Sequence, residues 1–283
     1  MNVLKTVDEL RILRKSVSEK GLTIGFVPTM GYLHRGHLEL VQRAVNECDV
    51  PVTSIFVNPT QFSPDEDFED YPRDMDRDLE LLESVGCFNA FCPEVEEVYP
   101  GGFCTAVTVE KLSGKLCGRY RPGHFRGVVT VVAKLLLMLL PDKAYFGEKD
   151  AQQLIIIRRM VKDLNIPCEI VGVPTVREPD GLAMSSRNLY LSPEERKAAP
   201  VLYRALISAK NMIDSGERNT TKILAMARKV IETEPLVRLQ YLEAVDREKL
   251  EPLEILKGEV LIALAAYLGR ARLIDNIMLD LEA

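Results

Sequence analysis

The 283-residue chain is 47% hydrophobic, which is enough to form the core of one large domain or of two domains of ordinary size. Its 36 basic and 42 acidic residues give a formal net charge of −6 without a long basic block, so a nucleic acid is not an expected partner. The most apolar run, residues 127–140, contains Lys134 and is shorter than the ~20 residues that cross a bilayer, so a membrane is not expected either.

The N-terminus and the cysteines favour a cytoplasmic location. The first 20 residues form a charged amphipathic pattern that lacks the apolar core of a signal peptide. The six cysteines form no CxxC pair, and no Cys/His cluster has the spacing of a zinc site. Free cysteine is commonly a small buried hydrophobe, so we expect reduced, structural thiols. They are Cys48, Cys87, Cys92, Cys104, Cys117 and Cys168.

Strand-like and helix-like patterns alternate through the first part of the chain. Residues 22–28 and 50–57 are short apolar runs, and the apolar spacing between them predicts a helix over 37–48. Such alternation is typical of a parallel sheet with helices on both faces. It continues with expected helices at 73–85, 127–140 and 151–164, expected strands at 88–92, 144–146 and 168–174, and the run TAVTVEKL at 105–112.

The pattern changes after the sequence SSRNLYLS. Ser192, Pro193 and Glu195 have the spacing of a capping box with a first-turn proline, which predicts a helix from there to about Ser215, with Gly216 as its stop. A second helix is expected at 221–234. Three strand-like runs follow at 237–245, 259–268 and 271–279. Helices followed by strands predict a smaller α+β domain from about residue 180.

The loop PTMGYLHRGH, residues 28–37, joins the first apolar strand to its helix. Ligands of an open parallel sheet bind beyond the carboxyl ends of the strands. Gly31 and Gly36 permit close approach to the backbone, and a helix N-terminus attracts anions. His34 and His37 add donors for the oxygens of a polyphosphate. The alternatives are a turn with incidental histidines or, less favoured because no third ligand is nearby, a metal site.

The chain has neither GxGxxG nor GxxxxGK[ST], but it has HxGH at residues 34–37. HxGH alone is weak evidence. Seven blocks in order give the chain a specific resemblance to the pantothenate synthetase (pantoate–β-alanine ligase) family, within the HIGH-motif nucleotidyltransferase-like superfamily. The departures are small: Arg35 fills a variable position, and residues 134–140 are unusually aliphatic. The blocks are GFVPTMGYLHRGH, SIFVNPTQF, YPRD, GRYRPGHFRGVVTVV, YFGEKDAQQL, TVREPDGLAMSSRN and GRARLIDN.

The resemblance implies a fold and a reaction. The fold is α/β, with a Rossmann-like parallel sheet that binds ATP and pantoate in residues 1–179 and a C-terminal α+β lid domain in residues 180–283. The reaction is ATP-dependent ligation of pantoate to β-alanine through a pantoyl adenylate, with release of pyrophosphate and AMP. Mg²⁺ accompanies ATP, and the protein is expected to be a homodimer.

The resemblance also implies roles for residues around ATP. His34, His37, Lys149 and Arg187 are expected to be catalytic, with His37 as proton donor. The segment MSSRN occupies the place of a KMSKS-type loop that closes over the phosphates, and Val176 lies beside the adenine. The expected ATP-binding residues are Met30, His34, Gly36, His37, Gly147, Lys149, Asp150, Val176, Met184, Ser185, Ser186 and Arg187.

Further residues are expected at the acid and at the metal. By resemblance Gln61 and Gln153 hold pantoate, and Asn58 lies in the same strand-end loop. Arg121 and His124 are expected to support the bound acid, the alternative being a turn fixed by Pro122 and Gly123. In the acidic stretch 64–83, which otherwise fits a solvated helix face, either Asp76 or Asp78 is the candidate for Mg²⁺.

Three other functions share some of these features. A nucleotidyltransferase that leaves AMP on its product uses the same HxGH chemistry. An aminoacyl-tRNA synthetase fragment does as well, although the acidic balance argues against it. A non-catalytic nucleotide sensor binds ATP through similar loops.

Overall fold

The computed structural model describes residues 1–62 and 68–281, and residues 64–67 of the acidic stretch lie outside this range. The chain divides into two compact units. The first contains residues 1–114, 118–148 and 152–174, and the second contains 115–117, 149–151 and 175–283. The division after Pro174 lies a few residues before the domain boundary expected at residue 180, and the second unit also takes two short segments from earlier in the chain.

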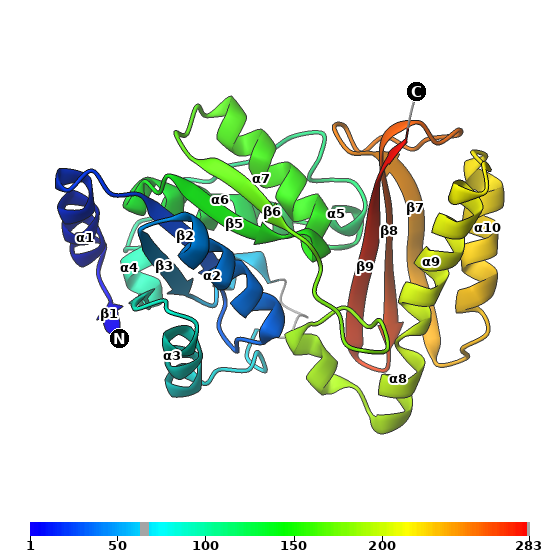
Figure 1. The fold of residues 1–283 in the computed structure, drawn as a ribbon, viewed down its shortest axis with the longest axis horizontal. Coiled ribbons are helices and arrows are strands. Elements are labelled where there is room, and N and C mark those ends of the chain that lie inside the picture. The colour runs from blue at the N-terminus through cyan, green and yellow to red at the C-terminus, as the bar shows by residue number, and fades with distance from the viewer. Residues whose placement is uncertain (63–67, 282–283) are drawn as a thin grey trace. The chain divides into compact units, whose positions relative to one another are not determined.

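A six-stranded sheet forms the first unit, and every pairing in it is parallel (Figure 1). This confirms the expected fold class. Strands β3 and β5 flank β2, so the strand order reverses at β2 and places a ligand-binding position at the carboxyl ends of β2 and β5. In spatial order the strands are β1 (Asn2–Leu4), β4 (Asn89–Phe91), β3 (Val50–Ile55), β2 (Ile24–Thr29), β5 (Lys143–Gly147) and β6 (Glu169–Val173).

Helices cover both faces of this sheet. Right-handed crossovers place α2 (Arg35–Glu47) and α3 (Met75–Ser84) on one face and α1 (Val7–Glu19), α6 (His124–Leu139) and α7 (Ala151–Asp163) on the other. The fully buried Leu33, Val41, Ala44 and Leu82 pack beneath α2 and α3 in one hydrophobic cluster. Short helices α4 (Val95–Val98) and α5 (Cys117–Tyr120) and the 3-10 turns η1 (Pro59–Gln61) and η2 (Glu148–Asp150) complete the connections.

Helix α6 contains the most apolar run of the sequence, and most of its residues are buried, as expected. Lys134 interrupts the run. Its Nζ lies 4.5 Å from the centre of the Phe103 ring, and desolvation lowers its pKa. In the part of the chain that the structure describes, no helix has the length and apolar character needed to span a membrane.

Residues 103–109, which include most of the run TAVTVEKL, form no strand. The backbone groups of Val107 bond instead to a side chain of α6. The Val107 N–H donates to Thr130 Oγ1 at 3.0 Å, and the Thr130 hydroxyl lies 3.4 Å from the Val107 carbonyl oxygen. The β-branched residues alone suggested continued alternation, but the backbone N–H and carbonyl of Val107 find their partner in the Thr130 side chain and not in a neighbouring strand.

The second unit has a three-stranded antiparallel sheet of β7 (Val237–Asp246), β8 (Gly258–Leu268) and β9 (Ala271–Leu281). Helices α9 (Val201–Asp214) and α10 (Thr220–Ile231) pack against each other and on this sheet (Figure 1). The predicted capping box of Ser192 and Glu195 is present and begins α8 (Pro193–Ala198). The single helix expected up to Ser215 is two, because Pro200 lacks the N–H that continuation requires.

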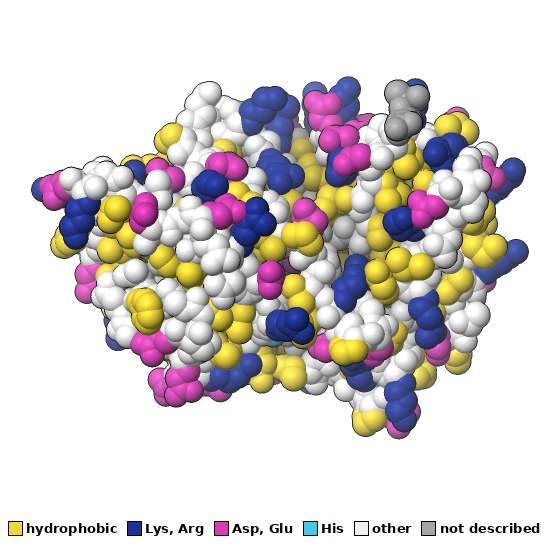
Figure 2. Space-filling view, viewed as in Figure 1, with side chains coloured by type: hydrophobic (Ala, Val, Ile, Leu, Met, Phe, Trp, Pro, Cys, Tyr) yellow, Lys and Arg dark blue, Asp and Glu magenta, His cyan; other side chains and the backbone are white. Residues whose placement is uncertain are grey.

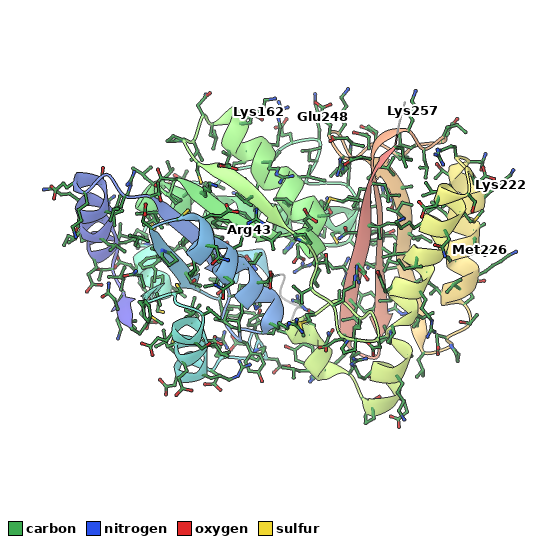
Figure 3. The ribbon with its side chains drawn as sticks, viewed as in Figure 1. Arg43, Lys162, Lys222, Met226, Glu248 and Lys257 are labelled. Carbon is green, nitrogen blue, oxygen red and sulfur yellow. The ribbon has the colours of Figure 1, made fainter. Side chains whose placement is uncertain are left out.

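The outward and inward faces of α10 differ in exposure. On α10, Lys222 and Met226 point away from the sheet (Figure 3), while Ile223 and Ala227 are fully buried. On the face shown in Figure 2, basic and acidic side chains are interspersed, as expected for a chain without a basic footprint.

All six cysteines are free. Burial raises the pKa of Cys92 to about 11 and that of Cys168 to about 12. Burial also raises the pKa values of the Cys48 and Cys87 thiols. These four side chains therefore stay protonated at neutral pH, which suits small buried hydrophobes rather than nucleophiles.

Candidate active site

The two histidines of HxGH cap the N-terminus of α2. His34 is the N-cap residue, and its Nδ1 accepts a hydrogen bond from the Gly36 N–H at 3.1 Å. His37 Nδ1 accepts in return from the His34 N–H at 3.3 Å. The two rings stack with their centroids 4.0 Å apart. A capping box built from two imidazoles therefore explains their three-residue spacing.

This capping fixes the tautomer of both rings. A nitrogen that accepts a hydrogen bond from a backbone N–H carries no proton, so each neutral imidazole holds its proton on Nε2. Each ring thereby becomes an Nε2–H donor at the positive end of the α2 dipole. The arrangement is suited to the oxygens of an anion.

The loop between β2 and α2 has an unusual backbone. Gly31 has φ of 82° and Tyr32 has φ of 47°, so two consecutive residues lie in the left-handed region. The Gly31 N–H bonds to Thr29 Oγ1 at 3.2 Å. A Cβ at Gly31 would lie only 3.0 Å from Ile55 and 3.1 Å from Asp78, so the loop requires glycine there.

The two candidate carboxylates of α3 have different surroundings. Asp76 is exposed in the first turn of the helix. Asp78 is only 1% exposed, and its Oδ1 accepts from the Leu33 N–H at 2.7 Å. Burial raises the pKa of Asp78, while bonds from the Leu33 and Tyr32 amides and the charge of Arg77 oppose that rise. Asp78 is thus committed to the β2–α2 loop.

Gln61, a predicted pantoate residue, is held from two sides in the turn after β3. Its Nε2 lies 2.7 Å from Met30 Sδ, which brings two predicted site residues into contact. Asn58, 1% exposed, donates to Gln61 Oε1 and to the Gly127 carbonyl and accepts from Thr60 and Tyr99 hydroxyls. The amide of Asn58 therefore fixes Gln61 from inside the fold.

His124 and Arg121 join the same group. His124 is the first residue of α6 and also closes the turn of Pro122 and Gly123, because its N–H donates to the Arg121 carbonyl at 3.1 Å. Its Nδ1 lies 2.8 Å from the Gln61 carbonyl oxygen. Its Nε2 lies 2.9 Å from Arg121 Nη1. Because a carbonyl only accepts and a guanidinium only donates, the ring is neutral with its proton on Nδ1. Gln61, Arg121 and His124 line a pocket of about 470 Å³ together with Phe62, Phe103 and Arg126.

Two further predicted residues lie beyond β5 in the first unit. Gly147 ends β5, which pairs in parallel with β2, the strand that leads into the histidine loop. Gln153 is half-buried in the first turn of α7. These positions place both residues near the carboxyl edge of the sheet, where a parallel α/β fold binds its ligands.

In the second unit, the segment that contains Lys149 and Asp150 is tied to β9. The Lys149 carbonyl accepts a hydrogen bond from Asn276 Nδ2 at 2.9 Å. Lys149 Nζ lies 3.6 Å from the Asp150 carboxylate, and its side chain is 20% exposed. An ammonium that is partly exposed and locally paired remains available to a stronger anion.

The other predicted ATP residues of this unit lie on one folded loop. Met184 donates its N–H to the Val176 carbonyl at 3.0 Å, closing residues 176–184 into a hairpin-like loop. Ser185 then caps the 3-10 turn η3 (Ser186–Tyr190) by accepting from the Arg187 N–H at 3.3 Å. Ser186 is 9% exposed, whereas Ser185 and Arg187 are half-buried. The serines and the arginine of MSSRN therefore lie in consecutive positions at the start of η3, with Ser186 buried.

One network in this unit was missed by residue-level reasoning on the sequence. Arg177 makes two hydrogen bonds to the Asp275 carboxylate, at 2.7 and 2.8 Å, and its guanidinium lies 3.9 Å from the Tyr203 ring centre. Asp275 is buried, at 4% exposed, and the Arg177 side chain is 16% exposed. It anchors the base of the 176–184 loop to β9. The only signal was that both residues lie in blocks shared with the family.

Comparisons with known proteins settle the family. The family model described as pantoate-beta-alanine ligase matches residues 2–278. The chain belongs to this ligase family. A pantothenate synthetase of Pelotomaculum thermopropionicum is 54% identical over 279 residues, covering 99% of each chain. One of Thermotoga petrophila is 55% identical over 279 residues, covering 99% of this chain and all of that one.

Solved structures of the family agree with the fold. The pantothenate synthetase of Thermus thermophilus matches with a TM-score of 0.93 and 51% identity, covering 98% of this chain and 99% of that one. A pantoate-beta-alanine ligase of Francisella tularensis, solved with a β,γ-ATP compound and β-alanine, matches with a TM-score of 0.79 and 36% identity, covering 98% and 97%. The chain is therefore an enzyme of the ligase class, as the sequence blocks predicted.

Proposed function

We propose that the chain joins pantoate to β-alanine in two steps that share one site. A carboxylate oxygen of pantoate attacks the α-phosphorus of ATP, and the bond to the bridging oxygen of pyrophosphate breaks. The amine of β-alanine then attacks the acyl carbon of pantoyl adenylate, the bond to the AMP oxygen breaks, and the nitrogen loses a proton. Pantothenate and AMP leave.

The observation that carries this proposal is the pair of Nε2–H imidazoles at the N-terminus of α2, in a chain of this family. A carboxylate is already a nucleophile at neutral pH, so the first step needs alignment and charge stabilisation more than a base. His34 and His37 supply fixed donors to the phosphate oxygens, and His37 is the proton donor. The positive end of the α2 dipole adds to this stabilisation.

The second unit supplies further cationic and hydroxyl donors in this proposal. Lys149 neutralises phosphate charge, and Asp150 accepts from the ribose hydroxyls. Ser185, Ser186 and Arg187 bind phosphate oxygens. Met184 and Val176 lie against the adenine, and the whole unit acts as a lid that excludes water from the reactive adenylate.

Pantoate binds through amides in this proposal. Gln61 and Gln153 each offer a donor and an acceptor, which suits a substrate with hydroxyl groups and a carboxylate. The neighbouring pair of Arg121 and His124 supports Gln61 through its carbonyl oxygen. Asn58 acts through Gln61, because its own amide is used within the fold.

Magnesium enters as part of the MgATP substrate. Among residues 1–62 and 68–281, no group of three or more His, Cys, Asp or Glu side chains is arranged as a resident metal site. Mg²⁺ on a nucleotide keeps several waters and needs only one or two carboxylates. Of the two candidates on α3, the exposed Asp76 fits that need better than the buried Asp78.

The test is exchange of labelled pyrophosphate into ATP without β-alanine. We expect exchange that requires pantoate, and AMP released in step with amide when β-alanine is added. Exchange that ignores pantoate would overturn the proposal. AMP retained on the product would indicate a nucleotidyltransferase, and tight ATP binding with no turnover for any acid and amine pair would indicate a sensor.

The cellular location and the oligomeric state of the protein are also proposed. Six free thiols fit a reducing compartment, so we place the protein in the cytoplasm. We also propose that it is a homodimer.

A further inference from the structure

We propose that Asp78, together with its neighbour Arg77, is a positioning residue that holds the β2–α2 loop so that His34 and His37 present their Nε2–H donors. The inference rests on the proposed function for its kinetic consequence. It assigns the buried carboxylate of α3 to the protein backbone rather than to a metal ion. Four observations in the first unit support it.

The first observation is that the Asp78 carboxylate is buried and bonded to the loop backbone. Asp78 is 1% exposed, and its Oδ1 accepts from the Leu33 N–H at 2.7 Å. Leu33 directly precedes His34 and is itself fully buried. Burying a carboxylate that makes no hydrogen bonds is unfavourable, and an apolar residue would fill this space at a lower cost in free energy. A carboxylate is retained here because the loop presents N–H groups to it.

The second is the shape of the loop. Gly31 and Tyr32 have left-handed conformations. The Leu33 N–H that follows them bonds to Asp78 Oδ1 at 2.7 Å, and the Tyr32 amide helps to lower the pKa of this carboxyl. Such a concave set of amides binds anions. Asp78 is the anion that this chain supplies for itself. A bulky residue such as Tyr32 keeps a left-handed φ only where its surroundings hold it.

The third is the close fit of glycine and carboxylate. A Cβ at Gly31 would lie 3.1 Å from Asp78 Oδ2. The carboxylate therefore packs directly against the turn that glycine makes possible. At this contact the β2–α2 loop and helix α3 pack so closely that no side chain fits between them.

The fourth observation concerns Arg77, which binds the carbonyl of Leu33, the residue whose N–H Asp78 binds. Its Nη2 donates to the Leu33 carbonyl at 2.9 Å, and its guanidinium lies 4.9 Å from the centre of the Tyr32 ring. Arg77 Nη1 lies 3.5 Å from Asp78 Oδ1. Both backbone polar groups of Leu33 are thus bound by consecutive residues of α3. This arrangement fixes the peptide that leads into His34.

The kinetic test compares Asp78→Ala with Asp78→Asn in pantoate-dependent pyrophosphate exchange. We expect Asp78→Ala to lower kcat by about 10- to 100-fold with little change in KM, because displaced donors weaken the transition state more than the bound substrates. Asp78→Asn keeps an acceptor for the Leu33 N–H and should recover most of the rate. Glu80→Gln, an exposed change on the same helix, should match the unmodified protein.

A second readout needs no activity. The chain has three histidines, so ¹⁵N NMR can assign the tautomer of each ring. In the unmodified protein we expect Nε2–H for His34 and His37 and Nδ1–H for His124. Asp78→Ala should mix the tautomers of the first two and leave His124 unchanged. A merely structural defect would not act on the two rings selectively.

The outcomes separate the two proposals. Absence of exchange in the unmodified protein would reject the proposed function, and the tautomers would still decide the role of Asp78. Full activity in folded Asp78→Ala, or equal losses in the Ala and Asn variants with unchanged tautomers, would overturn this inference. If Asp78→Ala fails to fold, Asp78→Asn and Arg77→Met carry the test, and Arg77→Met should lower kcat in the same direction.

Discussion

His37 is the residue in which structure and chemistry are hardest to separate. Its Nδ1 accepts the His34 N–H, which stabilises the first turn of α2, and the same bond leaves Nε2–H as a donor. One imidazole therefore serves the fold with one nitrogen and, in the proposed mechanism, the phosphates with the other. Substitution should affect both, but by different amounts.

We predict that His37→Ala lowers the rate of pantoate-dependent pyrophosphate exchange by about 100- to 1000-fold, since loss of one preorganised donor removes ~3 to 4 kcal/mol of transition-state stabilisation. Loss of its capping bond should reduce the free energy of unfolding by only about 1 kcal/mol. Single-turnover kinetics and urea unfolding measure the two effects. Glu39→Gln, exposed on the same helix, is the control. An unaltered single-turnover rate would remove His37 from the mechanism.

At the scale of elements, the buried ion pair of Arg177 and Asp275 joins the 176–184 loop to β9. Asp275→Ala should reduce the free energy of unfolding by about 3 kcal/mol, because it leaves a largely buried guanidinium, 16% exposed, without its carboxylate. Urea unfolding measures this. Asp280, on the same strand, pairs with Arg247 but is 76% exposed, so Asp280→Ala should cost less than about 1 kcal/mol. Equal effects of the two changes would contradict the argument.

Helix α2 and strand β5 are joined by Glu47, whose pH dependence can be predicted. Hydrogen bonds from Lys143 and then from Arg43, labelled on α2 in Figure 3, hold the pKa of this carboxyl below its ordinary value of 4.5. A lowered folded pKa stabilises the fold above the unfolded pKa, and this contribution is lost as the pH falls through the folded value.

Glu47→Gln should therefore lower the free energy of unfolding at pH 7, by no more than about 1 kcal/mol because water screens the group. The difference from the unmodified protein should shrink as the pH falls below 4.5. Urea unfolding from pH 7 to acid measures it. A difference that grows toward acid would have the wrong sign.

Local sequence patterns correctly predicted those elements that depend only on residues close together in the sequence. Strand and helix periodicity gave the parallel sheet, and the spacing of Ser192 and Glu195 gave the start of α8. They did not predict the break at Pro200 or the irregular course of residues 103–109. The latter depends on Thr130 of α6, which is distant in sequence.

The same distinction holds for the candidate site. HxGH and its neighbouring blocks identified the histidines, and their reciprocal capping follows from a three-residue spacing. The role of Asp78 depends on Leu33, and that of Asp275 on Arg177, across separations that no local pattern encodes. The family resemblance named many residues that are expected to contact the substrates, but it gave no reason for the groups that support them.

At the scale of the whole molecule, the proposed homodimer has a direct test. Sedimentation equilibrium should give twice the chain mass of 31.8 kDa at micromolar concentration. The measured mass should not depend on ATP, pantoate or β-alanine if the assembly is permanent. A single-chain mass across the accessible concentrations would exclude the dimer.

The second unit is discontinuous in sequence, because residues 115–117 and 149–151 belong to it. Cys117 Sγ lies 3.1 Å from Tyr241 Oη, and Asn276 holds the Lys149 carbonyl, so these segments contribute internal contacts of that unit. A gene fragment encoding only residues 175–283 would omit them. We therefore expect that recombination cannot transplant the C-terminal region by itself, and that an exchange between relatives needs all three separate pieces of the chain.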